Sequence, residues 1–156
     1  HMCNHNLNEI TENSLRFVDH RIKEFGIHLE KNLSPDLPEI YGDADNISQV
    51  IINIIVNALD SMSSGGNLTI KTGYCDFQHS SIQVVISDTG SGIPEEILNK
   101  IFNPFFTTKE MGSGLGLAIS KRIIDDHNGN IMVKSRVGKG TTFYICLPVR
   151  KVTVAT

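Results

Sequence analysis

The stretch from Asp88 to Leu117 reads DTGSGIPEEILNKIFNPFFTTKEMGSGLGL and joins two apolar patterns that differ in period. Before it, Ile82–Ser87 alternates over a few residues and is rich in β-branched side chains, which is typical of a strand. The end of the stretch overlaps the segment Leu115–His127, in which apolar residues recur at helical spacing. The sequence therefore predicts that Asp88 lies at a strand end, close to the start of a helix.

Glycines precede or open the predicted helix, at positions Gly112, Gly114 and Gly116. Glycine lets the backbone approach a bulky anion, and the free N–H groups of a helix start favour phosphate. The loop between the strand and the helix contains Pro94 and Pro104. We interpret this loop, residues 92–114, as a lid over a nucleotide. A flexible connector is the alternative, because a short glycine motif without context is weak evidence.

A second informative element is the helix predicted over Ile47–Met62, which is apolar around most of its circumference and therefore buried. One polar stripe interrupts it, formed by Gln49, Asn53, Asn57 and Asp60. A solvent-facing stripe is the alternative, but such stripes usually carry Lys or Glu, which favour helix more than Asn does. A carboxamide oxygen is a neutral ligand suited to Mg²⁺. The stripe therefore indicates a metal site.

The remaining periodicities predict a helix over Leu7–Phe25, with Phe17 on its apolar face, and four further strands over Ile27–Leu33, Asn67–Cys75, Ile131–Ser135 and Thr141–Leu147. We expect Asn8 or Thr11 to start the first helix, Gly26 to end it, a turn at Tyr41–Asp43, and Asp45 or Asn46 to cap the next helix. Hairpins outnumber crossovers in this order. The prediction is an α+β fold, a two-layer α/β sandwich whose mixed, mostly antiparallel sheet has helices on one face.

Thr141 shares a strand face with Phe143, Ile145 and Leu147, because successive side chains of a strand point to opposite faces. It therefore points toward the core or the edge of a pocket. A plain structural role is the alternative, since Thr is common in strands.

The 156 residues carry a net charge of −3 and three cysteines far apart in the sequence. We expect one domain over residues 3–150, a loose tail over 151–156, no nucleic-acid partner and a cytoplasmic location. No apolar run is long enough to span a membrane, although a parent protein with a membrane anchor is compatible with this chain. His1-Met2 is typical of a cloning remnant, which predicts an excised fragment. We also expect this fragment to be monomeric.

Five motifs in order resemble the ATP-binding catalytic domain of sensor histidine kinases, in the superfamily of gyrase, heat-shock-protein-90 and mismatch-repair ATPases. Gln49–Ala58 is similar to the asparagine box, and Asp88–Gly92 to the first glycine box. Ile101–Lys109 is similar to the phenylalanine box, Gly112–Leu117 to the second glycine box, and Gly138–Thr141 to the last. The resemblance implies a Bergerat-type ATP-binding fold with ATP and Mg²⁺ as cofactors.

The resemblance also implies roles for single residues. Asp88 would accept the adenine amino group, Asn57 would coordinate Mg²⁺, and Asn53 would assist with metal or phosphate. Phe102, Phe105 and Phe106 would anchor the lid or contact the helix that bears the substrate histidine. The other nucleotide-binding positions would be Asp60, Gly90, Gly92, Ile93, Lys109, Gly112, Ser113, Gly114, Leu115, Gly116, Leu117 and Thr141.

Gyrase-like relatives carry a Glu at the position of Asn53, and an amide cannot act as their general base toward water. This difference favours phosphoryl transfer over hydrolysis. No histidine here lies in the acceptor motif of such kinases, so the implied partners are a phosphoacceptor helical hairpin, dimeric in the full protein, and a response regulator receiver domain. The alternatives are an ATP-driven conformational switch with slow hydrolysis and an anti-sigma-type serine kinase.

Overall fold

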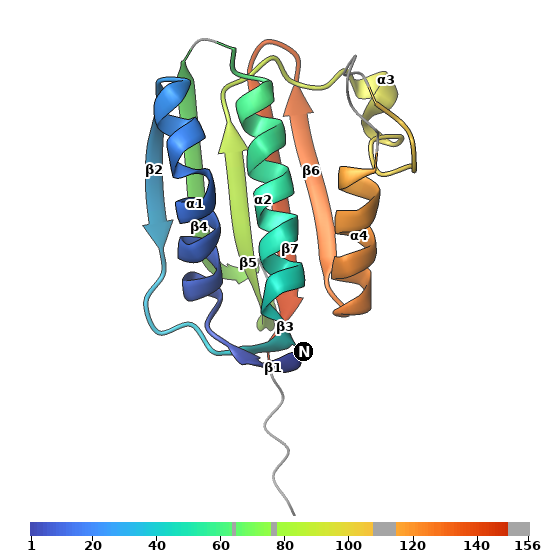
Figure 1. Ribbon diagram of the computed structural model, residues 1–156. Coiled ribbons are helices and arrows are strands. Elements are labelled where there is room, and N and C mark those ends of the chain that lie inside the picture. Colours follow the sequence, from blue (N-terminus) through green and yellow to red (C-terminus); the bar gives the residue numbers. More distant parts are fainter. Residues whose placement is uncertain (64, 76–77, 108–114, 150–156) are drawn as a thin grey trace, which may run out of the picture.

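The computed structural model describes residues 1–63, 65–75, 78–107 and 115–149, and Figure 1 shows their arrangement. The elements follow one another as β1 (Met2–His5), α1 (Leu7–Glu24), β2 (Ile27–Leu33), β3 (Ile40–Asp43), α2 (Ala44–Asp60), β4 (Gly66–Cys75), β5 (Gln78–Asp88), α3 (Glu95–Leu98), α4 (Gly116–Asp126), β6 (Asn130–Arg136) and β7 (Gly140–Pro148).

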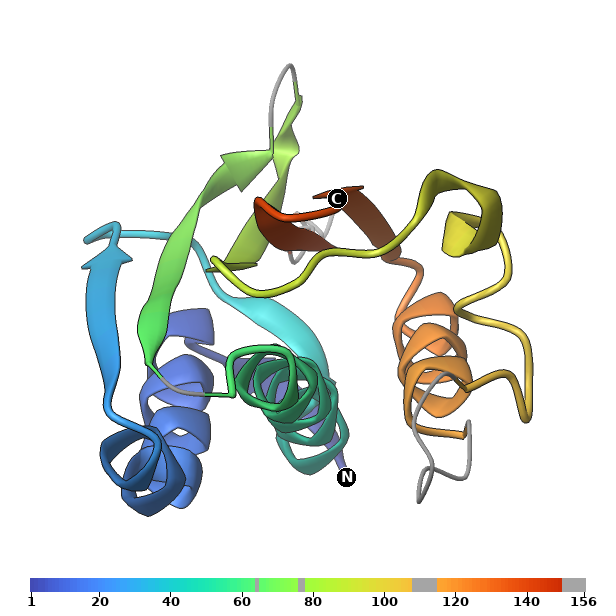
Figure 2. The same cartoon turned by 90° about the horizontal axis from the view of Figure 1, so that it is seen from above.

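The main sheet has five strands in the order β2-β4-β5-β7-β6. Its β2–β4 pair is parallel, and its other pairs are antiparallel. Figure 2 shows α1, α2 and α4 together on one side of this sheet. The predicted two-layer sandwich with a mixed, mostly antiparallel sheet is therefore confirmed.

The core lies between this sheet and α2, the central helix of the layer. Ile54 and Ile55 of α2 are fully buried, as are Ile82 of β5 and Ile145 of β7. Burying each such side chain contributes about 1.5–3 kcal/mol. The apolar run of α2 is therefore explained by its central place, and its polar stripe lies along one edge of the helix.

The first helix buries the first half of its predicted face, Leu7, Ile10 and Ser14, but not the second half. Phe17, which the spacing placed on the apolar face, is 77% exposed, whereas Leu15, Val18 and Ile22 are buried. The helix is capped by Asn6, whose side chain accepts a hydrogen bond from the N–H of Asn8, so the expected starts at Asn8 and Thr11 were wrong. The helix does end before Gly26, which takes the left-handed conformation (φ 65°) expected after a C-cap.

The predicted turn at Tyr41–Asp43 is instead part of β3, which pairs with β1 in a second, antiparallel sheet. Asp43 caps α2 by accepting from the N–H of Asn46, so the caps expected at Asp45 and Asn46 were also wrong. Strands of four residues have too little periodicity to be recognised in the sequence, and pairing defines them. Met2, predicted to belong to a cloning remnant, lies within β1 opposite Asp43.

Within the part of the chain that the structure describes, every helix is too short or too polar to cross a membrane.

Candidate nucleotide-binding site

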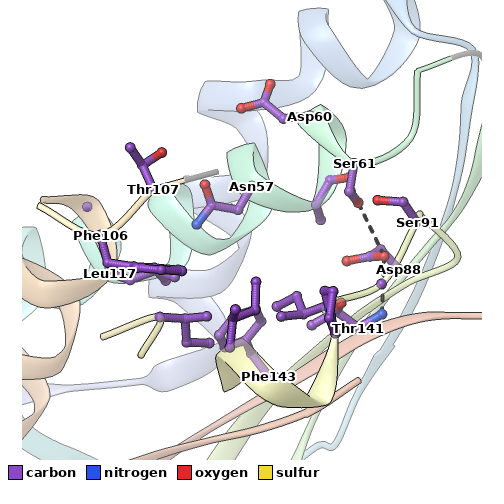
Figure 3. Close-up of a pocket in the computed structure, with 17 residues that line it drawn as sticks. Asn57, Asp60, Ser61, Asp88, Ser91, Phe106, Thr107, Leu117, Thr141 and Phe143 are labelled. Carbon is purple, nitrogen blue, oxygen red and sulfur yellow. Dashed lines mark hydrogen bonds between the residues drawn. The ribbon is translucent and has the colours of Figure 1, made fainter. Parts of the chain in front are cut away.

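A cavity of about 600 Å³ lies where the C-terminal ends of α2 and β5 meet the start of α4 (Figure 3). The described part of the predicted lid forms one of its walls. Its volume is in the usual range for small-molecule sites. The residues that line it are Asn57, Ala58, Asp60, Ser61, Asp88, Ser91, Gly92, Ile93, Pro94, Ile97, Ile101, Phe106, Thr107, Gly116, Leu117, Thr141 and Phe143.

Asp88 is one of the two acidic residues that line the cavity in the described part of the chain. It is the last residue of β5, as predicted, and is only 7% exposed. Its Oδ1 accepts hydrogen bonds from the N–H of Gly90 at 2.8 Å, from the N–H of Thr141 at 3.3 Å and from the hydroxyl of Ser61 at 3.4 Å. Burial raises the pKa of this carboxyl, and the hydrogen bonds, of which that from Gly90 is the strongest, oppose the rise.

All of these bonds are made by one oxygen of the carboxylate. Among the described residues, no donor is bonded to the other oxygen, Oδ2, although Asp88 lines the cavity. A carboxylate oxygen that opens onto a cavity can accept a hydrogen bond from a ligand or a water. The arrangement therefore suits a ligand with an N–H group directed at Asp88, such as the amino group of adenine.

Thr141 points inward, as strand alternation predicted, and is 6% exposed. Its hydroxyl shares a hydrogen bond of 2.7 Å with the hydroxyl of Ser135, which also donates to the carbonyl of Gly140 and accepts from the N–H of Ile93. These bonds fasten the first residues of the predicted lid to the β6–β7 hairpin. They keep Ile93, Thr141 and Asp88 at one end of the cavity.

Asn57 lies toward the other end of the cavity, near Thr107 and Leu117, as Figure 3 shows. Gly116 and Leu117, at the start of α4, line the same end. Asp60 lines the rim and forms an ion pair of 3.6 Å with Arg21 of α1. Of the other predicted phosphate-binding positions, Leu115 directly precedes α4, whereas Lys109, Gly112, Ser113 and Gly114 lie outside the described residues.

Two predicted site residues, Asn53 and Gly90, lie beside the cavity and do not line it. The amide of Asn53 faces α4, where its Nδ2 donates to the buried hydroxyl of Ser120 at 3.4 Å. Gly90 contributes only its N–H, which donates to Asp88.

The three phenylalanines predicted as lid anchors have different surroundings. Phe102 packs edge-to-face on Phe143 of β7, with ring centroids 6.4 Å apart, and Phe106 lines the cavity. Phe105 is 74% exposed and has a positive φ of 67°. Its exposure does not fit the predicted anchoring role.

The sequence analysis missed several lining residues, of which Ser61, Ser91 and Phe143 have the clearest contacts. Ser61 follows α2 and donates to Asp88, and its carbonyl accepts from the N–H of Ser91. Phe143 is on the inward face of β7, where alternation from Thr141 placed it, but it was not predicted to belong to the site. Ser61 and Ser91 carried no such signal, because their role depends on how two chain ends meet.

Among the described residues, no cluster of three or more His, Cys, Asp or Glu side chains could hold a metal ion. Mg²⁺ at nucleotide sites is usually held by one or two protein oxygens together with phosphate oxygens, and it keeps several waters. The amide oxygen of Asn57 at the cavity wall fits that pattern. The residues present therefore fit a metal that arrives with the nucleotide.

The family model of histidine kinase-, DNA gyrase B- and HSP90-like ATPases matches residues 42–151. The catalytic domain of the histidine kinase ThkA has the same fold, with a TM-score of 0.84 and 32% identity over 95% of this chain and 97% of that domain. The chain thus belongs to this ATPase family and, within it, to the catalytic domains of sensor histidine kinases.

Sporulation kinase E of Bacillus subtilis (strain 168) is 38% identical over 143 residues, which are 92% of this chain but 19% of that kinase. The chain therefore spans about a fifth of the length of this relative. A structure of ThkA in complex with the response regulator protein TrrA matches with a TM-score of 0.81 and 29% identity, over 96% of this chain and 42% of ThkA.

One backbone contact beside Asp88 predicts a large loss of stability. Gly140 has a φ of 131°, and a Cβ there would overlap the carbonyl oxygen of Asp88 and lie 3.0 Å from the Cα of Thr89. We expect Gly140→Ala to lower the free energy of unfolding by about 2–4 kcal/mol. Gly116→Ala is the matched control, because a Cβ at Gly116 meets nothing within 4 Å and its φ is not positive.

Thermal unfolding of the two variants, followed by circular dichroism, measures the difference. The control should change stability by less than about 1 kcal/mol, and in the stabilising direction if at all. Equal melting temperatures for Gly140→Ala and the unsubstituted chain would contradict the close approach of β7 to the end of β5.

Proposed function

We propose that this chain binds ATP with Mg²⁺ and donates the γ-phosphate to a histidine on a separate helical hairpin. The observation that carries the proposal is the buried Asp88 carboxylate, whose Oδ2 faces the cavity without a donor among the described residues. A carboxylate in that state distinguishes adenine from guanine, because guanine presents an oxygen where adenine presents an amino group.

The cavity suggests the orientation of the nucleotide. With the base against Asp88 and Thr141, the phosphates would extend toward Asn57 and the first turn of α4. The backbone N–H groups at Gly116 and Leu117 are not all used within the helix, and the positive end of the helix dipole favours phosphate there. Asn57 would hold Mg²⁺, which, when bound, neutralises the charge of the transferring phosphoryl group.

The contacts of Asn53 support transfer over hydrolysis. An amide has no basic group that could remove a proton from water, and this one donates to Ser120. A kinase of this kind mainly orients the γ-phosphate and stabilises its charge, so it needs no base on this domain.

The acceptor histidine belongs to another domain in this proposal. His127 is buried and bonded to backbone groups, and His5 contacts the thiol of Cys3 at 3.1 Å. His20 is exposed on α1 but has no acceptor motif around it. We propose the hairpin of the parent kinase, dimeric in the full protein, as the acceptor, and a response regulator receiver domain as the next partner, in the cytoplasm where ATP is supplied.

Labelled ATP tests this function. Alone, the chain should remain unlabelled and should release little phosphate, because acceptor and base are both lacking. With the hairpin of the parent kinase added as a separate polypeptide, acid-labile label should appear on its histidine, slowly because the tether that raises the effective concentration is missing. Steady release of phosphate without the hairpin would favour a conformational-switch ATPase, and labelled serine on a partner protein would favour a serine kinase.

A further inference from the structure

Helix α4 lines one end of the cavity at its first turn, yet it buries fewer side chains than α1 or α2. Ser120 and Ile124 are the buried residues of this 11-residue helix, and Leu117 and Ile123 pack against the core while only partly buried. Helices α1 and α2 bury seven residues each. Figure 1 shows α4 at one side of the helix layer, next to β6. Because α4 has fewer buried side chains than the other two long helices, individual hydrogen bonds contribute a larger share of what holds it in place.

One of these bonds ties α4 to α2 near the middle of α4. The amide of Asn53 on α2 donates to the hydroxyl of Ser120, at a long distance of 3.4 Å. A single long bond of this kind holds the helix near one point but leaves its tilt weakly determined.

A stronger connection lies at the C-terminal end of α4. The ring of His127, the C-cap residue, is 7% exposed and bridges two backbone groups. Its Nε2 accepts from the N–H of Asp43 at 3.0 Å, so the proton of the neutral ring is on Nδ1. Nδ1 then donates to the carbonyl of Ile123 at 2.7 Å. His127 therefore joins the last turn of α4 to the residue that caps α2.

Gly42 leaves room for this ring. A Cβ at Gly42 would lie 2.7 Å from Cδ2 and 2.9 Å from Nε2 of His127, so the ring packs directly on the bare backbone of β3. Gly42 is also paired with Cys3 of β1, which fixes the backbone of β3 at this point. The imidazole is therefore held between fixed backbone groups and cannot shift without displacing α4 or β3.

We propose that His127 is a positioning residue for phosphate binding, which sets the tilt of α4 and thereby the place of the N–H groups at Gly116. At 1.5 Å per residue, Gly116 lies about 6 Å and His127 about 10 Å from Ser120 along the axis. A shift of about 1 Å at His127, with Ser120 as the pivot, would then move Gly116 by about 0.6 Å. Displacements of that size are enough to impair a binding site built from hydrogen bonds.

The inference rests on the proposed function and predicts a selective effect on phosphate. His127→Gln can keep an acceptor near Nε2 and so the bond from Asp43. The shorter side chain of His127→Asn can still donate to Ile123 but does not reach Asp43. We expect His127→Asn to weaken a non-hydrolysable ATP analogue by about tenfold and adenosine by less than about twofold, while His127→Gln restores most of the difference.

Calorimetric titration in the presence of Mg²⁺ measures the affinity of each variant for the ATP analogue and for adenosine, and the ratio of these two affinities is compared between variants. Thermal unfolding of each variant is recorded beside it. A purely structural role would lower the melting temperature and leave the ratio of the two affinities unchanged, which overturns the inference. Gly42→Ala perturbs the same ring from the side of β3 and should shift the ratio in the same direction. If His127→Asn does not fold, Gly42→Ala provides the test. An unchanged ratio of the two affinities in Gly42→Ala would also overturn the inference.

Failure of the inference and failure of the proposed function give different results. If the unsubstituted chain binds neither adenosine nor the ATP analogue, the proposed function fails. If it binds both and neither variant changes the ratio, the function stands and only the role of His127 is wrong.

Discussion

Asp88→Asn is expected to weaken the binding of adenosine and adenine nucleotides by roughly 10- to 150-fold, the equivalent of losing one hydrogen bond to a charged group. In the free protein, Oδ2 of Asp88 faces the cavity with no donor among the described residues. An asparagine can present an N–H group at that position, directed at the amino group of the base, so attraction is replaced by repulsion. Calorimetric titration with adenosine and with ADP measures the loss.

The same substitution should leave the fold at least as stable. Asparagine keeps an oxygen that can accept from the N–H groups of Gly90 and Thr141. Burial raises the pKa of Asp88, so the ionised carboxylate at neutral pH lowers the free energy of unfolding of the ligand-free protein. Removal of that charge relieves the cost. A melting temperature that falls in Asp88→Asn, or ADP affinity that is unchanged, would contradict the assignment.

The pH dependence follows from the same shift. Because the pKa of Asp88 is higher in the folded than in the unfolded chain, its contribution to stability is fully present below the unfolded value, about 3.9. That contribution is lost as the pH rises through the folded pKa. Adenosine binding depends on pH in the opposite direction, because it needs the ionised carboxylate. It should therefore weaken as the pH falls through the folded pKa of Asp88. Asp88→Asn is the control and should show neither effect.

Asn57→Ala is expected to reduce phosphoryl transfer to the hairpin histidine by at least about 100-fold, because several kcal/mol of charge stabilisation depend on the metal. Asn57 lines the cavity at the end away from Asp88, where its amide oxygen can meet a metal held by phosphates. Adenosine, which has no phosphates, should bind Asn57→Ala as well as the unsubstituted chain. The Mg²⁺ dependence of ATP-analogue binding should disappear.

Gln49→Ala is the matched control, since Gln49 is on the same stripe of α2 and does not line the cavity. It should retain transfer activity and Mg²⁺ dependence. Labelling of the hairpin and titrations with and without Mg²⁺ provide both readouts. If Gln49→Ala and Asn57→Ala lose activity equally, or if Asn57→Ala loses adenosine binding as well, the loss reflects damage to α2 and the metal assignment is wrong.

The sequence alone determined the elements whose side chains repeat over several turns or strand residues. The apolar circumference of α2, the strand that ends at Asp88 and the inward face of Thr141 are local patterns, and each was predicted correctly. The order of the five motifs was sufficient to recognise the class of protein. The Phe17 prediction failed because one helical spacing fits more than one face of a helix, and packing selects the face.

Only the tertiary structure decided which polar groups meet. Asn53 was predicted beside metal or phosphate, yet it bonds to Ser120, which is 67 residues away in the sequence. Ser61 reaches Asp88 across 27 residues, and His127 reaches Asp43 across 84. A hydrogen bond depends on distances of tenths of an ångström between groups that the fold brings together, and no periodicity in the sequence records them. The pattern of apolar residues thus determined the layers, whereas the packing of the layers determined the site.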